Sequence, residues 1–99
     1  MSIFSIFSKG GGVAEMKEKN AVVIDVRTTA EFAGGHVKGS KNYPLQDLKS
    51  KTNKIKNLNR PVIFCCASGM RSGQATQMFK RQGVECMNGG SWQSVARHY

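Results

Sequence analysis

Two runs of almost entirely apolar residues limit what this chain can fold into more than any other feature of its sequence. Residues 21–26 read Ala-Val-Val-Ile-Asp-Val, and residues 61–65 read Pro-Val-Ile-Phe-Cys. A strand with one solvated face alternates apolar and polar residues, whereas a parallel strand covered on both faces is apolar along its length. The two runs therefore predict buried strands of a parallel sheet.

Helical segments alternate with these strands. Thr28 or Thr29 can cap a short helix that ends before Gly34-Gly35, and Gly83 is a typical C-terminal stop for a longer helix. Apolar spacing predicts helices at 13–19, 30–33 and 72–82, loose helical turns between 45 and 58, and a last short helix that begins after a Gly89-Gly90 turn and carries Trp92. Shorter strands are expected at 42–43 and 84–87. This alternation predicts an α/β domain with a mostly parallel sheet and right-handed crossovers.

The length and the first residues define the domain. A chain of 99 residues is enough for one core and too short for two. The Gly10–Gly12 run separates a short apolar tail, residues 1–10, from a single domain at residues 11–99. The tail lacks a basic start and a long apolar stretch, so it is a poor secretory signal, and no run approaches the ~20 residues of a membrane helix. We therefore expect a cytoplasmic monomer that does not bind membranes.

Charge is unevenly spread. Fifteen Lys and Arg against six Asp and Glu give a net charge of +9, and much of the excess lies between Lys38 and Arg60. No nucleic-acid motif accompanies it, so a solvated basic face is favoured over specific nucleic-acid binding. The run from Lys49 to Lys56 is a candidate docking site for an acidic protein partner.

The three cysteines do not form a disulfide framework pattern, because their number is odd. Cys65 and Cys66 are adjacent, which matches no zinc spacing, and we predict neither a metal nor a cofactor. Cys65 ends an apolar strand and is expected to pack, as is Cys86 in a later strand. In a reducing compartment, a cysteine with special surroundings is more often catalytic than structural.

Cys66 has such surroundings. It precedes Ala67-Ser-Gly-Met-Arg-Ser72, a stretch of mostly small residues between a buried strand and a helix. A loop that enters a helix there turns its N–H groups inward, and the helix N-terminus adds partial positive charge. This setting lowers the pKa of a cysteine thiol and suits a thiolate nucleophile that takes a group from an anionic donor.

The run Cys66-Ala-Ser-Gly-Met-Arg-Ser72 resembles the active-site loop of rhodanese-like sulfurtransferases, in which Gly, Arg and Ser or Thr follow the cysteine by three, five and six positions. Two further stretches resemble that family in order and spacing. The first runs from Val23 to Pro44 and includes Asp25, Arg27, Glu31, Phe32, Gly35, His36, Gly39, Ser40 and Asn42; the second includes Gly83, Gly89, Gly90 and Trp92. The resemblance covers roughly residues 13–96.

The resemblance implies a fold and a mechanism. The fold is a small, mostly parallel sheet of about five strands with helices on both faces. Cys66 would take the outer sulfur of an anionic donor such as thiosulfate, a persulfide or a polysulfide, hold it as a persulfide, and pass it to a thiol or cyanide. The implied substrate-binding residues are those of the loop: Ala67, Ser68, Gly69, Met70, Arg71 and Ser72.

The supporting residues have open roles. Arg71 either binds the anion directly or pairs with an acid such as Glu31. Asp25 and Arg27 are expected to hold the active-site loops by hydrogen bonds rather than to transfer protons. His36 is expected to make a structural hydrogen bond.

Two other functions remain as alternatives. Counted from Cys65, the distance to Arg71 matches the loop of cysteine-dependent phosphatases, and arsenate reduction is a further option on the same fold; Phe64 stands where such phosphatases usually have His. A non-catalytic rhodanese-like interaction module is the other alternative, although such modules usually lack the cysteine. Within the sulfurtransferase interpretation, Ala67 and Met70 leave Arg71 as the loop's one cationic side chain, which favours a persulfide or protein donor over thiosulfate.

Overall fold

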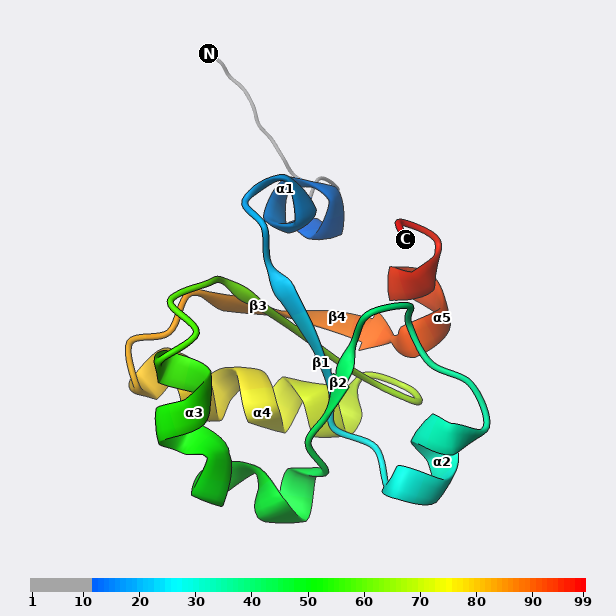
Figure 1. The fold of residues 1–99 in the computed structure, drawn as a ribbon, viewed down its shortest axis with the longest axis horizontal. Helices are drawn as coiled ribbons and strands as arrows, with labels where there is room; N and C mark the ends of the chain where they lie inside the picture. The colour runs from blue at the N-terminus through cyan, green and yellow to red at the C-terminus, as the bar shows by residue number, and fades with distance from the viewer. Residues whose placement is uncertain (1–11) are drawn as a thin grey trace.

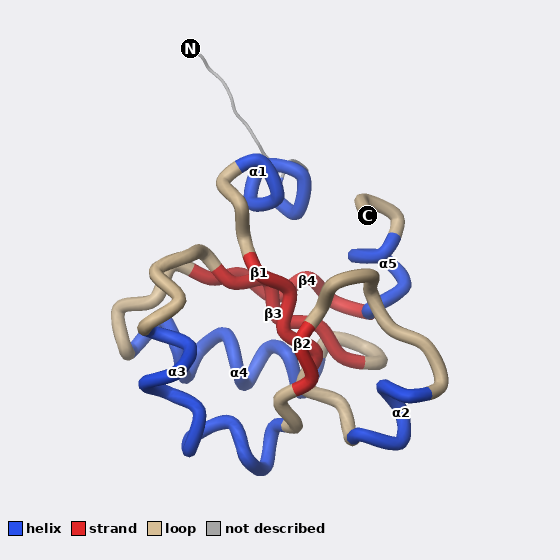
Figure 2. Tube along the Cα trace, in the orientation of Figure 1, coloured by secondary structure: helices blue, strands red, loops and turns tan. Residues whose placement is uncertain are grey.

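Four parallel strands form one sheet within residues 12–99, the part of the chain that this computed structural model describes. The predicted tail, residues 1–10, lies outside the described residues. The strands lie in the order β2-β1-β3-β4 (Figures 1 and 2). Their bounds are β1 Val22–Asp25, β2 Lys41–Asn42, β3 Val62–Cys66 and β4 Cys86–Ser91. The apolar runs predicted as buried strands are therefore the two central strands.

Helices cover both faces of this sheet, as Figure 1 shows. One face is covered by α1 (Gly12–Glu18) and α5 (Trp92–Ala96), and the other by the 3₁₀ helix η2 (Leu45–Lys51), α3 (Thr52–Lys56) and α4 (Met70–Arg81). The short helix α2 (Thr29–Ala33) follows the carboxyl end of β1. The predicted α/β class is confirmed.

The strand number differs from the expectation of about five. Only four segments of residues 12–99 pair as strands. The segments between them form helices or short loops. β2 is itself only two residues long, paired with β1 at Lys41 and Asn42. The compact sheet still brings the carboxyl ends of all four strands to one edge, which we call the carboxyl edge; the opposite one is the amino edge.

The side chains of β3 alternate between the two cores. Val62, Phe64 and Cys66 belong to the core under α4, and Ile63 and Cys65 belong to the core under α1 and α5. Each of the five is at most 1% exposed. Because successive strand residues point to opposite faces, the two adjacent cysteines are separated by the sheet itself.

The Gly89-Gly90 pair lies inside β4 and does not form the predicted turn. Phe64 pairs with Asn88 and Cys65 pairs with Gly90, so Gly89 is an extra residue in the ladder, a β-bulge. A Cβ on Gly89 would lie 2.6 Å from Cγ2 of Val95 and 2.8 Å from Cγ2 of Ile63. The close approach of β3 and α5 therefore requires glycine here, and the bulge carries the strand on to Ser91.

Helix α4 begins two residues earlier than predicted. Gly69 precedes it with a φ of 105°, a left-handed conformation that glycine adopts without strain, and no side chain caps the first turn. The missing cap explains why the sequence pattern predicts a start at Ser72. No helix among residues 12–99 is long and apolar enough to cross a membrane.

Candidate active site

Cys66 ends β3 at the carboxyl edge of the sheet, and residues 67–69 lead from it into α4. Its Sγ accepts hydrogen bonds from the backbone N–H of Gly69 at 3.0 Å and of Ser72 at 3.4 Å. The Ser72 hydroxyl lies 3.3 Å from the same sulfur. The loop is thus closed around a single sulfur atom, with donors arriving from several directions.

These donors decide the charge of the sulfur. Burial alone would raise the pKa of the Cys66 thiol, but hydrogen bonds from the side chain and backbone of Ser72 and from the backbone of Gly69 and Ser68 outweigh it. The pKa of Cys66 therefore lies below the ordinary thiol value, because each donor favours the thiolate.

The other two cysteines have the opposite environment. Burial, followed by the nearby charge of Asp25, raises the pKa of Cys65 to about 12. Burial also raises the pKa of Cys86. All three cysteines are free, and Cys66 is the one whose surroundings favour a nucleophile.

Arg71 does not contact the sulfur. Its two terminal nitrogens donate to the Glu31 carboxylate at 2.8 and 3.0 Å, a two-point ion pair. This bond, with help from the Thr28 N–H, lowers the pKa of Glu31 to about 2. Of the two roles left open by the sequence, the structure has Arg71 paired with Glu31 at the rim of the site.

Asp25 and Arg27 form a second, buried pair at the end of β1. The guanidinium donates to the carboxylate with contacts of 2.7 and 3.0 Å, and a terminal nitrogen donates to the Gly35 carbonyl at 2.6 Å. The same guanidinium lies 5.0 Å from the centre of the Trp92 ring. The pair thus ties β1, the loop after α2 and the start of α5 together. Neither residue touches Cys66 by a hydrogen bond.

The remaining predicted residues lie at the surface. Ala67, Ser68 and Met70 are exposed, and Met70 is 76% exposed. His36 Nδ1 lies 2.7 Å from the Phe32 carbonyl, and its ring stacks on the Phe32 ring. The mouth of the site is therefore apolar or neutral, with the paired Arg71 beside it.

Asn88 is the site residue that sequence reasoning missed. Its Oδ1 accepts from the Ser72 hydroxyl at 2.7 Å and from the Gly90 N–H at 2.9 Å, and its Nδ2 donates to the Gly69 carbonyl at 2.9 Å. No spacing relative to Cys66 marks it. The one available signal was its place, a polar residue after the apolar start of a strand whose carboxyl end shares an edge with the loop.

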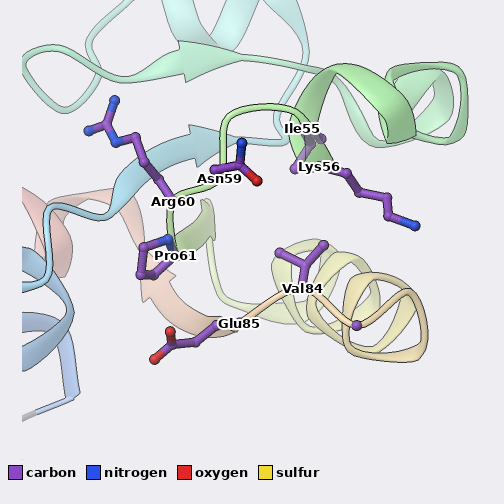
Figure 3. A pocket seen from close by; sticks show the side chains of 8 residues that line it. Ile55, Lys56, Asn59, Arg60, Pro61, Val84 and Glu85 are labelled. Carbon is purple, nitrogen blue, oxygen red and sulfur yellow. The ribbon is translucent and has the colours of Figure 1, made fainter.

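Hollows occur at both edges of the sheet. One of about 300 Å³ adjoins Arg71 at the carboxyl edge and is lined also by Val26, Thr28, Pro44, Leu45 and Gln46. Another of about 260 Å³ opens at the amino edge, around Pro61, Val84 and Glu85 (Figure 3). Only the first lies beside the loop that holds Cys66.

Known proteins resemble this chain in both sequence and fold. The model of the rhodanese-like domain matches residues 12–96. The chain belongs to the rhodanese-like domain family. Thiosulfate sulfurtransferase GlpE of Pseudomonas aeruginosa is 32% identical over 91 residues, covering 84% of this chain and 79% of that protein. A solved rhodanese from Escherichia coli, described with anions, has a TM-score of 0.69 at 29% identity, covering 77% of this chain and 92% of that one.

A further relative has a higher identity over a shorter stretch of this chain. The uncharacterized protein YqhL of Bacillus subtilis is 42% identical over 65 residues, which is 66% of this chain. The chain spans about half of that relative's length, 51%. Family membership and fold are therefore established for the rhodanese-like domain, and the reaction has to be argued from the site.

Proposed function

We propose that this protein is a sulfurtransferase that carries a sulfane sulfur as a persulfide on Cys66. The observation that supports this most is the closure of the loop on one sulfur atom, with the Gly69 N–H 3.0 Å from Sγ. Such a cradle suits a single sulfur and stabilises negative charge on it. Membership of a family with relatives named thiosulfate sulfurtransferase agrees with this interpretation.

The reaction has two steps. The Cys66 thiolate attacks the outer sulfur of a donor, a new S–S bond forms, and the donor's own bond to that sulfur breaks with its electron pair. Sulfite leaves when the donor is thiosulfate, and a thiolate leaves when it is an organic persulfide. An acceptor thiolate or cyanide then attacks the outer sulfur, and the electron pair of the Cys66 S–S bond returns to Cys66. A covalent intermediate of this kind predicts ping-pong kinetics.

We favour an organic persulfide over thiosulfate as the donor. Thiosulfate is a dianion, and the guanidinium nearest the loop, Arg71, is held by Glu31 at 2.8 Å. The mouth otherwise carries the exposed Met70, and the adjoining hollow of about 300 Å³ includes the apolar side chains of Val26, Pro44 and Leu45 in its lining. These features suit the carbon skeleton of a monoanionic donor or acceptor better than a compact double charge.

The alternative phosphatase interpretation depends on Cys65. Its side chain lies on the far face of the sheet from Cys66, and its pKa is raised to about 12. A thiol in that setting has little thiolate for attack on phosphate. The geometry therefore favours the register that begins at Cys66.

The deciding experiment is mass spectrometry of the purified protein after treatment with thiosulfate or with a small alkyl persulfide. We expect one added sulfur on Cys66, removed by cyanide as thiocyanate, with kcat/KM higher for the persulfide. Hydrolysis of an aryl phosphate without persulfide formation would contradict the proposal. A higher kcat/KM for thiosulfate would contradict only the donor preference.

A further inference from the structure

The amide of Asn88 is held in one orientation by two backbone groups. The Gly90 N–H can only donate, and it lies 2.9 Å from Oδ1; the Gly69 carbonyl can only accept, and it lies 2.9 Å from Nδ2. The amide oxygen must therefore be the atom that faces the Ser72 hydroxyl, at 2.7 Å. Because an amide oxygen only accepts, this contact is a hydrogen bond only while Ser72 donates its proton to Asn88.

Ser72 cannot serve two acceptors at once. Its hydroxyl carries one proton, and the Cys66 sulfur lies 3.3 Å from the same oxygen. When the proton points to Asn88, the Ser72 oxygen can accept a hydrogen bond from a neutral Cys66 thiol. When Cys66 is a thiolate, the hydroxyl can instead turn to the sulfur, and the contact with Asn88 is lost.

We infer that Asn88 is a positioning residue that competes with the Cys66 sulfur for the hydroxyl proton of Ser72. Ser72 is fully buried, so no solvent reaches that hydroxyl from its own side. Asn88 is exposed on its other side, at the edge of β4. Asn88 therefore supplies the second position in which the proton can rest.

The packing around Asn88 keeps it in place. A Cβ on Gly73 would lie 3.3 Å from Nδ2 of Asn88, and one on Gly69 would lie 3.9 Å from it. The bulge at Gly89 directs the strand so that Asn88 faces the loop while Gly90 turns its N–H back to the amide. The two glycines, Gly69 and Gly73, thus leave room for the Asn88 amide.

The charged groups near Cys66 make no hydrogen bond to its sulfur and are paired with each other, although the Arg71 guanidinium interacts with the Cys66 charge at longer range. Arg71 is held by Glu31 at the start of α4, and Arg27 is held by Asp25 at the end of β1. Cys65, on the opposite face, is kept neutral by its raised pKa. The hydroxyl and the loop N–H groups are the donors that reach the sulfur.

The competition has a role in the proposed sulfur transfer, on which this step of the inference rests. In the free thiolate, the sulfur is anionic and attracts the Ser72 proton. In the persulfide, the charge lies on the outer sulfur, and the inner sulfur becomes a weak acceptor. The proton then returns to Asn88, so that the buried hydroxyl is satisfied in both states of the cycle.

The test is the pH dependence of Cys66 alkylation by iodoacetamide in Asn88→Ala, with the modified cysteine identified by peptide fragmentation between Cys65 and Cys66. Removing the competing acceptor frees Ser72 for the thiolate, so the midpoint should move to lower pH. At a fixed pH below the midpoint, the thiolate fraction should rise roughly threefold, as expected for one neutral hydrogen bond. Asn53→Ala, an exposed asparagine on α3, is the matched control and should leave the midpoint unchanged.

The double variant separates this role from simple support of the loop. In a Ser72→Ala background, Asn88→Ala should not move the midpoint further, because there is no proton to compete for. A midpoint that rises or stays constant in Asn88→Ala would overturn the inference. So would an equal shift in the Ser72→Ala background, which would assign the effect to the Gly69 contact.

Alkylation needs no sulfur donor, so it reports on Asn88 even if the proposed function is wrong. A second measurement uses the function: the persulfide fraction of Cys66 at equilibrium with an alkyl persulfide and its thiol. Asn88→Ala should lower the ratio of persulfide to thiolate roughly threefold, since the persulfide loses its resting place for the Ser72 proton. Absence of any persulfide in the unchanged protein would count against the proposed function, and the alkylation result would still decide the inference.

Discussion

The carboxyl edge of the sheet pairs its charged side chains around the loop, whereas one hollow at the amino edge gathers cations. At the carboxyl edge, Arg71 is held by Glu31 and Arg27 by Asp25, and the sulfur is surrounded by peptide N–H groups and one hydroxyl. At the amino edge, a hollow of about 340 Å³ is lined by four cations and no acidic side chain: Lys17, Lys38, Lys41 and Arg60. This cluster of basic side chains therefore lies at the edge of the sheet opposite the candidate active site.

The difference teaches where the field at Cys66 comes from. A cationic side chain next to a thiolate would be screened by salt and would attract any anion. Hydrogen bonds from Gly69 and Ser72 act over one atom and persist at any ionic strength. Net charge was thus a poor guide to the site, and loop geometry a good one.

The largest effect should come from the sulfur itself. Cys66→Ser should abolish persulfide formation, because a hydroxyl at neutral pH is a far weaker nucleophile than a thiolate. Cys65→Ser should keep most of the activity and lower the free energy of unfolding by about 1–3 kcal/mol, the cost of a buried hydroxyl without a partner. Sulfur transfer and persulfide mass in each variant check both. Full activity in Cys66→Ser with loss in Cys65→Ser would revive the phosphatase register.

A matched glycine pair tests the two edges directly. Gly69 and Gly83 both have a positive φ, 105° and 80°, and Gly83 lies at the amino edge, where an added Cβ would meet nothing within 4 Å. Ala at either site should cost about 1–2 kcal/mol of stability from left-handed strain. Only Gly69→Ala, which displaces an N–H from Cys66, should also slow persulfide formation, by roughly tenfold or more. Equal kinetics in the two variants would mean that the loop donors are unimportant.

Glu31→Gln tests whether the ion pair with Glu31 neutralises the Arg71 guanidinium at the carboxyl edge. Gln keeps the capping contact to the Thr28 backbone, whereas the ion pair with Arg71 is lost. With its guanidinium no longer neutralised, the site should raise kcat/KM for thiosulfate about threefold to tenfold and change that for an alkyl persulfide little. Because the pKa of Glu31 is about 2, the pair is intact in the unchanged protein down to acidic pH and is lost only as pH falls through that value. An unchanged preference in Glu31→Gln would show that Arg71 does not influence donor choice.

The smallest effect should come from the basic run. Lys49, Lys51, Lys54 and Lys56 lie on η2 and α3, and none of them lines the hollow beside Arg71. Replacing all four by Gln should leave turnover of a small donor within about twofold. An acidic protein donor, if the run binds one, should lose association rate, and the loss should fade as salt is added. A large loss with the small donor at high salt would place these lysines in the site.

The sequence was sufficient where burial and local chemistry act together. The apolar runs predicted β1 and β3 because a strand covered on both faces can hold no solvent-facing residue, and Thr28 caps α2 as its sequence suggests. It failed where a long-range contact overrides a local rule. Gly89 and Gly90 looked like a turn, and only the approach of Ile63 and Val95 explains why β4 continues through them.

The candidate site divides in the same way. Cys66 and its loop are contiguous, so their geometry follows from one short segment. The partner of Arg71 lies 40 residues away, and the sequence could offer two roles for it but not choose between them. Asn88 reaches Ser72 across 16 residues and through a bulge, and no local pattern marks such a contact.

Under the proposed function, the opposite orientation of Cys65 and Cys66 should prolong the lifetime of a persulfide on Cys66. The side chain of Cys65 lies on the opposite face of the sheet from that of Cys66. Cys86 pairs with Val62 at the other end of β3, about 13 Å along the strand from Cys66 at ~3.3 Å per residue. Neither of these thiols can therefore attack a Cys66 persulfide to form a disulfide and release sulfide. Under the proposed function, the sulfur is therefore removed only by an external acceptor, and the rate of its removal depends on how fast that acceptor binds.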